Sequence, residues 1–267
     1  MSVEVSEQFK RDWGGAPSFD ELMALDGEMY RQVARRKTFK FNLNGNEYFA
    51  KIHNGVGWPE IIKNLVQGRK PVLGAKNEYD AIHALSKLDI KTMTLAAYGQ
   101  RGSNVAELES FVITESLEPA VSLEDFCVDW AINKPTPRLK RALIKRVAMI
   151  ARELHENGIN HRDLYICHFL LNENELQSLT DLNELQLYLI DLHRVQLRPK
   201  TPERWLVKDL AALYFSSMDI GFTKRDFYYF VREYTKNSLK TELSINEAFW
   251  NKVEKKALYL KTKPLKG

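Results

Sequence analysis

The sequence predicts an α+β fold in two parts, because strand patterns lie mostly in its first half and helical patterns mostly in its second. A hairpin is expected over residues 38–52, where two alternating runs flank Asn44-Gly45, a dipeptide that readily takes the positive φ of a tight turn. An apolar stripe at helical spacing covers residues 138–157, and the pattern after Pro202 stays helical. This separation of strands from helices favours α+β over an alternating α/β order.

The first part of the chain is expected to contain the hairpin, one helix and two more strands. Residues 1–25 are interpreted as a helical arm, in which Phe19, Leu22 and Met23 have helical spacing. The other elements expected here are a glycine- and proline-rich insertion with one or two helical turns, a helix and two strands, over residues 53–74, 75–88, 93–98 and 109–114. This part therefore covers residues 26–118 after the arm.

The second part, residues 119–267, is expected to be mainly helical. Its long helix over residues 138–157 ends at Asn157-Gly158, a typical helix stop. The other elements expected before Pro202 are a helix and two short strands, over residues 123–133, 169–171 and 185–190. The last segment, after Pro202, should consist of helices with a strongly basic surface.

Composition places the chain among ordinary globular proteins. It has 267 residues, of which 44% are hydrophobic and 28% charged, so disorder, collagen and coiled coil are excluded as descriptions of the whole. Two distant cysteines, Cys127 and Cys167, argue against a disulfide framework or a zinc ribbon and fit a reducing compartment. The sequence shows no secretory signal pattern and no apolar run of membrane-spanning length, so we expect a cytoplasmic protein.

Positive charge is unevenly distributed along the chain. The net charge is +4, yet residues 194–267 hold 16 Lys and Arg against 8 Asp and Glu. Residues 29–46 and 130–152 contain basic side chains and no acidic ones. Such clustering favours an anionic partner, which could be a phosphate, a lipid head group or an acidic protein, although solvated helix faces are the alternative. We expect no nucleic-acid partner, because no zinc-finger, helix-turn-helix or RNA-binding pattern accompanies the basic runs.

Several polar residues occur in an order that points to phosphoryl transfer. Lys51 ends a hairpin strand, Glu78 lies on the first helix, His161-Arg162-Asp163 follows the long helix, and Asp191 ends an apolar strand 28 positions later. This set resembles the protein-kinase signature. The resemblance implies a two-lobed protein-kinase-like fold, with a small antiparallel-sheet N-lobe and a reduced, mainly helical C-lobe. It also implies that Lys51, held by Glu78, orients the phosphates of ATP, that Asp191 binds Mg²⁺, and that Asp163 and Arg162 act in catalysis.

The sequence departs from the protein-kinase pattern in ways that suggest a different acceptor. The glycine-rich loop is replaced by the turn Gln32–Lys37, where Arg35, Arg36 and Lys37 could clamp phosphate with their side chains. His168 stands at the position of the metal-binding Asn, and we expect it to contact a phosphate or water, because Mg²⁺ prefers oxygen ligands. Only 17 residues separate Asp191 from Asp209, which leaves little room for an activation segment and favours a small-molecule or glycolipid acceptor over a peptide.

A closer resemblance is to the lipopolysaccharide core heptose(I) kinases of Gram-negative bacteria. It is carried by the following strings: Asn160-His-Arg-Asp-Leu-Tyr-Ile-Cys-His-Phe-Leu-Leu171, Leu189-Ile-Asp-Leu-His-Arg194, Tyr48-Phe-Ala-Lys51, Phe19-Asp-Glu-Leu-Met23 and Lys208-Asp-Leu-Ala211. The resemblance implies ATP-dependent phosphorylation of the first inner-core heptose at its 4-hydroxyl, on the cytoplasmic face of the inner membrane. It places the adenine-binding hinge at residues 114–117, with Glu115 and Leu117 offering backbone groups.

Two other functions stay open from the residues. A protein kinase, with Tyr165 as a site of self-phosphorylation, is disfavoured by the short segment after Asp191. A pseudokinase or scaffold is disfavoured because all the polar groups named above are present, although His168 keeps it open. The apolar stripe of the last helix includes Trp250 and Val253. We favour its packing on the helical lobe over contact with a membrane surface, and an acidic protein could dock on the surrounding lysines.

Overall fold

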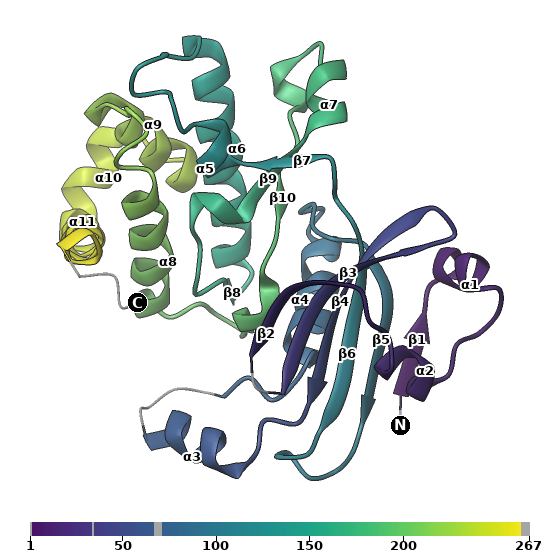
Figure 1. Cartoon of the computed structure of the whole chain (residues 1–267). Coiled ribbons are helices and arrows are strands. Elements are labelled where there is room, and N and C mark those ends of the chain that lie inside the picture. The colour runs from purple at the N-terminus through teal and green to yellow at the C-terminus, as the bar shows by residue number, and fades with distance from the viewer. Residues whose placement is uncertain (1, 34, 67–70, 263–267) are drawn as a thin grey trace. The chain divides into compact units, whose positions relative to one another are not determined.

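The computed structural model describes residues 2–33, 35–66 and 71–262 (Figure 1). The chain divides into two compact units, each described here by itself. The first, which we call the sheet unit, comprises Met1–Ser86, Thr92–Leu117 and Leu192–Arg194. The second, which we call the helical unit, comprises Lys87–Lys91, Glu118–Asp191 and Val195–Gly267. No helix in the part of the chain that the structure describes is both long enough and apolar enough to cross a membrane.

The sheet unit is built on a six-stranded antiparallel sheet with the strand order β1-β5-β6-β4-β3-β2 (Figure 1). Its strands, in chain order, are β1 (Ser2–Val5), β2 (Glu28–Val33), β3 (Arg36–Leu43), β4 (Asn46–Asn54), β5 (Leu95–Arg101) and β6 (Glu109–Glu115). The predicted hairpin is confirmed, because β3 and β4 pair around Asn44 and Gly45, which have φ angles of 52° and 89°. The strands expected over residues 93–98 and 109–114 correspond to β5 and β6.

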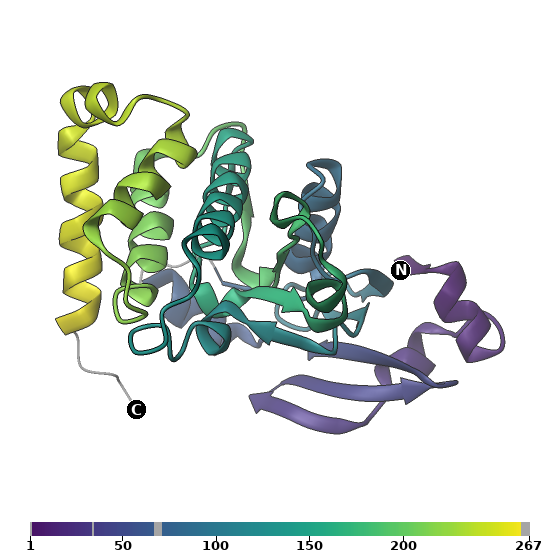
Figure 2. The ribbon, with the colours of Figure 1, turned by 90° about the horizontal axis from the view of Figure 1, so that it is seen from above.

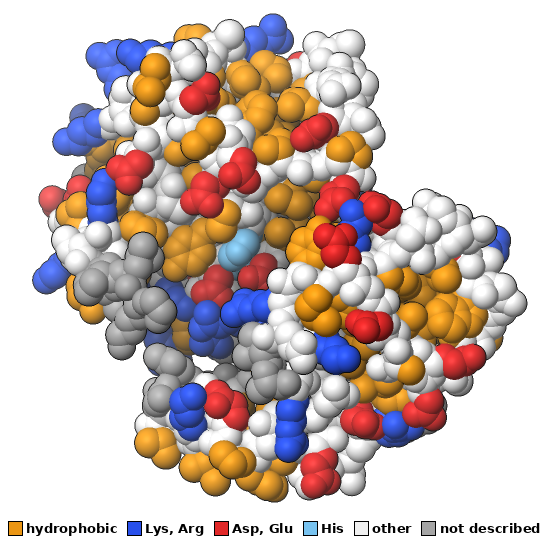
Figure 3. Space-filling model, viewed as in Figure 1, with side chains coloured by type: hydrophobic (Ala, Val, Ile, Leu, Met, Phe, Trp, Pro, Cys, Tyr) orange, Lys and Arg blue, Asp and Glu red, His pale blue; other side chains and the backbone are white. Residues whose placement is uncertain are grey.

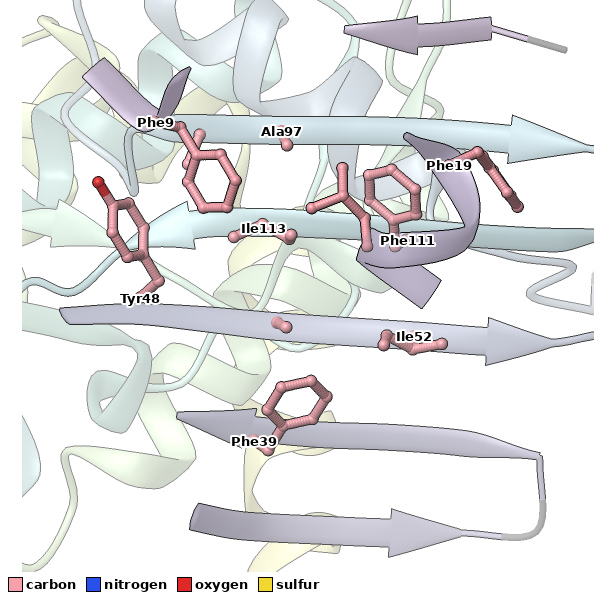
Figure 4. Close-up of a cluster of buried hydrophobic side chains, with 11 residues drawn as sticks. Phe9, Phe19, Phe39, Tyr48, Ile52, Ala97, Phe111 and Ile113 are labelled. Carbon is pink, nitrogen blue, oxygen red and sulfur yellow. The ribbon is translucent and has the colours of Figure 1, made fainter. Parts of the chain in front are cut away.

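Aromatic side chains cover one face of this sheet. Helices α1 (Glu7–Trp13) and α2 (Phe19–Met23) bring Phe9 and Phe19 onto the strands, where Figure 4 shows them with Tyr48, Phe111 and Phe39. Ser18 caps α2 and completes a capping box with Glu21. The arm expected to be helical therefore consists of two short helices, but it also contributes strand β1, which pairs with β5.

Alternation along β4 decides which of its side chains face this core and which face the opposite side of the sheet. Ala50 and Ile52 are buried in the aromatic cluster, so Lys51 points to the opposite face of the sheet. Helix α4 (Lys76–Lys87) carries Glu78, which pairs with Lys51, and this helix confirms the one expected over residues 75–88. The insertion expected before it contains α3 (Trp58–Val66), while residues 67–70 lie outside the described residues.

The helical unit is arranged around α6 (Pro137–Glu156) and α8 (Glu203–Ser216), which pack against α9 (Lys224–Thr235) and α11 (Glu247–Thr262), respectively. Figure 2 shows α11 at the outer edge of the unit. The smaller elements are α5 (Leu123–Phe126), β7 (Ala120–Ser122), β8 (Ile159–Asn160), β9 (Phe169–Asn172), α7 (Glu173–Ser178), β10 (Tyr188–Leu189), β11 (Gln196–Leu197) and α10 (Leu239–Ile245). Strand β9 pairs with β7 and β10, and β8 pairs with β11.

Two expected elements of the helical unit differ in the structure. The helix expected over residues 123–133 ends at Phe126, because the following backbone bonds, such as Trp130 to Cys127, span three residues and form successive turns. The strand expected over residues 185–190 shrinks to β10. The apolar stripe of the last helix packs on α8, since Val253 and Ala257 are buried against it.

Candidate active site

The sheet unit holds a buried ion pair between Lys51 and Glu78. The Nζ atom of Lys51 lies 2.7 Å from Oε1 of Glu78, whose side chain is only 2% exposed. The other carboxylate oxygen, Oε2, is buried and has no hydrogen-bond partner among the residues that the structure describes. Because Lys51 keeps about a quarter of its side-chain surface (24%), it has room to contact a further anion. This pair is therefore not the surface ion pair that a chance Lys and Glu would form.

The turn between β2 and β3 places three predicted phosphate-binding cations together. Arg36 and Lys37 begin β3 in register with Val33 and Gln32 of β2, and the exposed Arg35 precedes them. Ala34 lies outside the described residues. Side-chain cations thus occupy the turn where a protein kinase carries glycines, and they are available to bind anionic oxygens.

The pKa of a histidine in the same unit is affected by the positive charges of Arg36 and Lys51. His53, at the end of β4, is buried, and burial together with the charges of Arg36 and Lys51 lowers its pKa to about 4. A neutral His53 near pH 7 avoids adding a third positive charge beside Arg36 and Lys51. The positive charge in this region is therefore carried by Arg36 and Lys51 and not by His53.

The predicted hinge residues lie where the sheet unit ends. The N–H of Glu115 donates to the carbonyl of Thr94, and the N–H of Ser116 donates to the carbonyl of Glu47. Burial raises the pKa of the Glu115 carboxyl. Leu117 is half-buried and is the last residue of this stretch of the unit. The N–H of Glu115 is engaged within the sheet, so adenine recognition by Glu115 and Leu117 stays a prediction.

In the helical unit, a buried aspartate holds the backbone of the loop that carries the predicted base, Asp163. Asp209, on α8, is 0% exposed and accepts the N–H of His161 at 2.7 Å and the N–H of Arg162 at 2.8 Å. Arg162 has a φ of 76°, a conformation that costs about 1–3 kcal/mol for a residue other than glycine. Two charge-assisted hydrogen bonds, both accepted by Asp209, therefore hold the strained Arg162 in place before Asp163.

His168 connects the two predicted catalytic aspartates. Its Nδ1 lies 2.7 Å from the backbone carbonyl oxygen of Asp163, and since a carbonyl can only accept, Nδ1 carries the proton. Its Nε2 then lies 3.5 Å from Oδ2 of Asp191. The N–H of Ile190 donates to the carbonyl of His168, which ties both segments together. Like Arg162, Asp191 has a positive φ, of 60°.

The donor set around Asp191 is compatible with one magnesium ion. Mg²⁺ usually binds one or two carboxylates, several waters and the phosphates of its nucleotide, rather than a complete protein cage. In the described part of the chain, no cluster of three or more acidic, histidine or cysteine side chains has metal-binding geometry. The partly exposed carboxylate of Asp191 is therefore the residue that would hold Mg²⁺, and the Nε2 atom of His168 lies next to it.

Three residues of this region had no role in the sequence analysis. Asp209 served only to mark the end of the short segment after Asp191 and as part of one family string, yet a lone acid inside an apolar helix segment was a usable signal of a buried acceptor. His155 lies 3.5 Å from Oδ2 of Asp209 through Nε2, and its Nδ1 lies 2.8 Å from the hydroxyl of Tyr234. Trp205, in the first turn of α8, is surrounded by cations.

The helical unit also contains a large, mostly apolar cavity. Its volume is about 710 Å³, and side chains of α6, α8, α9 and α11 line it. Among its lining residues are Val147, Leu210, Phe227 and Trp250, with Lys224 also on its wall. Since well-packed interiors rarely keep voids larger than a water molecule, a space of this size is typical of a ligand site.

Comparisons with known proteins agree on one family. The sequence profile of the lipopolysaccharide kinase (Kdo/WaaP) family matches residues 20–234. The lipopolysaccharide core heptose(I) kinase WaaP of Pseudomonas aeruginosa is 47% identical over 257 residues, which cover 96% of this chain and 95% of that protein. The same-named kinase of Escherichia coli strain K12 is 47% identical over 259 residues, which cover 97% of each chain.

A solved structure agrees with the sequence comparisons. "WaaP in complex with acyl carrier protein" superposes with a TM-score of 0.83 and 42% identity, and the match covers 97% of this chain and 99% of that chain. The predicted fold class, an α+β protein-kinase-like fold with a small antiparallel sheet and a mainly helical second part, is therefore confirmed. By sequence and by structure, the chain belongs to the lipopolysaccharide kinase (Kdo/WaaP) family.

Proposed function

We propose that this chain is an ATP-dependent kinase that phosphorylates the first heptose of the lipopolysaccharide inner core at its 4-hydroxyl. The observation that carries this proposal is the 47% identity over nearly the whole chain to kinases named for that reaction. The polar groups described above support it, because each has a place in phosphoryl transfer. The relatives named above are heptose(I) kinases and favour neither a protein kinase nor a pseudokinase.

In the proposed mechanism, Asp163 accepts the proton of the attacking sugar hydroxyl, and the backbone of Arg162, held by Asp209, keeps that loop in place. Lys51, held by Glu78, contacts the inner phosphates of ATP, and the cations of the turn after β2 contact other phosphate oxygens. Mg²⁺ held by Asp191 would stabilise the negative charge that develops on the phosphate oxygens. Catalysis then depends on positioning and charge stabilisation, as in other phosphoryl transfers.

Transfer from labelled ATP tests the proposal. The acceptors are an inner-core saccharide that lacks the heptose phosphate and, in parallel, a peptide pool. We expect label only on the saccharide, with mass spectrometry placing the phosphate on the proximal heptose. Asp163→Asn should lower kcat about 10²–10⁴-fold, because general base catalysis contributes that much. Asp181→Asn, at a side chain that is 47% exposed, is the matched control. Label on peptides alone would contradict the proposal.

We further propose that an acyl carrier protein binds the helical unit and inserts its acyl chain into the apolar cavity. A relative has been solved with such a carrier, and the cavity of about 710 Å³ has the apolar lining that an acyl chain needs. Acyl carrier proteins are acidic, so the basic surface expected for this unit would favour docking. Figure 3 shows one face of the molecule, where Lys and Arg side chains are interspersed with acidic ones.

A cavity-filling substitution tests this partner. Val147→Phe places a larger side chain into the cavity, whereas Val128→Phe makes the same change at a site that is 75% exposed. In a pull-down, wild type and the Val128 variant should retain the acylated carrier better than the carrier without its acyl chain. The Val147 variant should lose that preference. Equal retention of both carrier forms by wild type would refute insertion of the chain.

For membrane association, we propose that α3 contacts the lipid surface. Trp58, Ile62, Leu65 and Val66 follow helical spacing on one side of α3 and are 53%, 55%, 60% and 82% exposed. In Figure 3, apolar side chains gather along the lower edge, where Figure 1 places α3. The glycolipid acceptor is anchored in a membrane, so an apolar helix face would bring the enzyme to it.

Flotation with anionic lipid vesicles tests the contact. We expect the full chain to float with the vesicles and Ile62→Ser/Leu65→Ser to remain in solution. The control is Val128→Ser/Ile132→Ser, which removes two apolar side chains that are 75% and 85% exposed in the helical unit. Equal flotation of both variants would exclude α3 as the contact.

A further inference from the structure

The large cavity of the helical unit reaches the segment that carries the predicted base. Ile166 comes three positions after Asp163, lines this cavity and is only 4% exposed. Leu210, which directly follows Asp209 on α8, also lines the cavity. The polar groups of the loop and part of the cavity wall therefore belong to the same two segments of backbone.

Hydrogen bonds join the wall residue Ile166 to the base and to α8. The N–H of Ile166 donates to Oγ of Ser216 at 3.1 Å, and this hydroxyl donates to the carbonyl of Leu213, another wall residue. In the same short 3₁₀ turn as Ile166, His168 contacts the carbonyl oxygen of Asp163 through Nδ1 at 2.7 Å. A shift of Ile166 would therefore be passed to the backbone of Asp163.

A second connection leads from the aromatic wall of the cavity to Asp209. The ring of Tyr234, on α9, stacks with Phe230 at a centroid distance of 5.9 Å and meets Trp250 edge-on at 6.0 Å. Both of these partners line the cavity. The hydroxyl of Tyr234 lies 2.8 Å from Nδ1 of His155. The Nε2 atom of His155 in turn faces Asp209, the carboxylate that holds the loop.

This second connection can tighten. The Nε2 atom of His155 is buried and lies 3.5 Å from Oδ2 of Asp209, too far for a good hydrogen bond, and it has no other partner among the described residues. A movement of the aromatic wall that brings the two atoms to about 3.0 Å would complete a hydrogen bond there. The position of the wall therefore bears on the group that orders the loop.

A chain that fills the cavity would strengthen both connections. Side chains on a cavity wall have protein contacts on one side only, and segments with few buried contacts are the ones that open locally. An acyl chain would supply contacts to Ile166, Leu210 and the rings around Tyr234. The loop should then be held more firmly, because the strained backbone of Arg162 depends on its surroundings.

We propose that an acyl chain in the cavity activates the enzyme by fixing the loop that carries Asp163, with Ile166 as the positioning residue. The inference rests on the proposed function, including the binding of an acyl carrier protein. It adds regulation to that function, since turnover then depends on whether the carrier holds an acyl chain. The cavity and the site of phosphoryl transfer are thus two coupled sites.

Steady-state kinetics of the full chain measure the activation. Saturating carrier is added with or without its acyl chain, and transfer from ATP to the core saccharide is followed. The acylated carrier should raise kcat at least about fivefold, the lower end of typical coupling between sites, and leave the KM for ATP unchanged. An equal kcat with both carrier forms would overturn the proposal.

Two isoleucine variants separate the loop from the rest of the cavity wall. Ile166→Ala should abolish the increase in kcat. Ile144→Ala removes the same atoms from the wall at α6, where the side chain is 5% exposed, and should retain the increase. Both variants are assayed at a temperature where they are folded. Loss of the increase in both variants would trace the effect to acyl binding alone and would also overturn the proposal.

Hydrogen exchange gives a readout that needs no turnover. The amides of His161 and Arg162, both accepted by Asp209, follow the opening of the loop. In wild type they should exchange at least about fivefold more slowly with the acylated carrier than with the carrier that lacks its chain. In Ile166→Ala the two rates should be equal. Equal rates in wild type would overturn the proposal.

The outcome is separable from that of the kinase assay. Slower exchange with the acylated carrier, without transfer to the saccharide by wild type, would refute the proposed function and support the coupling. Transfer at the same rate with both carrier forms would refute the coupling and leave the kinase function standing.

Discussion

Replacement of Asp209 by asparagine tests whether catalysis depends on the backbone of the loop that carries Asp163. The carboxylate accepts two backbone N–H groups, at 2.7 and 2.8 Å, and is fully buried. Asparagine offers only one acceptor oxygen and turns its NH₂ group toward the second N–H donor. The variant therefore loses one charge-assisted hydrogen bond, which contributes about 1.5–3 kcal/mol, and leaves a buried N–H unsatisfied.

The loss should appear in catalysis as well as in stability. The loop conformation includes Arg162 at a φ of 76°, which costs about 1–3 kcal/mol and persists only while its surroundings hold it. Release of that strain would let Asp163 leave its catalytic position. We expect kcat to fall about tenfold to a hundredfold, or about 1.4–2.8 kcal/mol in activation free energy, with the KM for ATP nearly unchanged.

Asp226→Asn is the matched control for this prediction. Asp226 is also a buried acid of the helical unit, but it accepts from Lys140 and caps α9 at Thr223. Both variants should have lower melting temperatures, and only the Asp209 variant should lose kcat. Equal kcat values for the two variants at a temperature where both are folded would refute the positioning role of Asp209.

Three further predictions concern single polar groups. The pKa of His53 is about 4 when folded and near 6.5 when unfolded, so the unfolded chain binds an extra proton between these values. The free energy of unfolding should therefore fall by up to about 3 kcal/mol as the pH drops from 6.5 to 4. Chemical denaturation of His53→Asn should show a weaker dependence on pH, and an unchanged dependence would contradict this. Glu78→Gln should raise the KM for ATP about tenfold by releasing Lys51, whereas Glu60→Gln, at an exposed ion pair on α3, should leave this KM unchanged. Equal KM values for the two variants would contradict a role of the Lys51–Glu78 pair in binding ATP. His168→Asn should reach half-maximal turnover at lower Mg²⁺, because an amide oxygen is a better ligand for this ion, and a titration showing a higher requirement would disprove it.

Local patterns were sufficient to predict the hairpin at the centre of the sheet unit. The Asn44-Gly45 turn sets the register of β3 and β4, and alternation along β4 then puts Lys51 on the face opposite the aromatic core. The pairing of Glu78 with Lys51 was implied by the resemblance to protein kinases and not by a local pattern. Strand β1 could not be predicted, because a four-residue edge strand is defined by its partner β5 rather than by its own sequence.

The contacts of the catalytic loop depend on tertiary structure that no local pattern encodes. Asp209 is 48 positions from His161, and only the packing of α8 beneath the loop turns a helical acid into its backbone acceptor. The same packing brings Trp205 to Arg162. The helix expected over residues 123–133 failed for a related reason, because its apolar spacing is equally satisfied by successive turns that bury Cys127 and Trp130.

His168 makes a contact that the motif alone did not indicate. From its position it was expected to contact phosphate or water in place of a metal-binding asparagine, and that role stays a prediction. In the structure, its Nδ1 proton is used on the carbonyl of Asp163, so only Nε2 remains, and that atom lies 3.5 Å from Asp191. Because His168 contacts both the backbone of Asp163 and the carboxylate of Asp191, it couples the position of the predicted base to that of the predicted metal ligand.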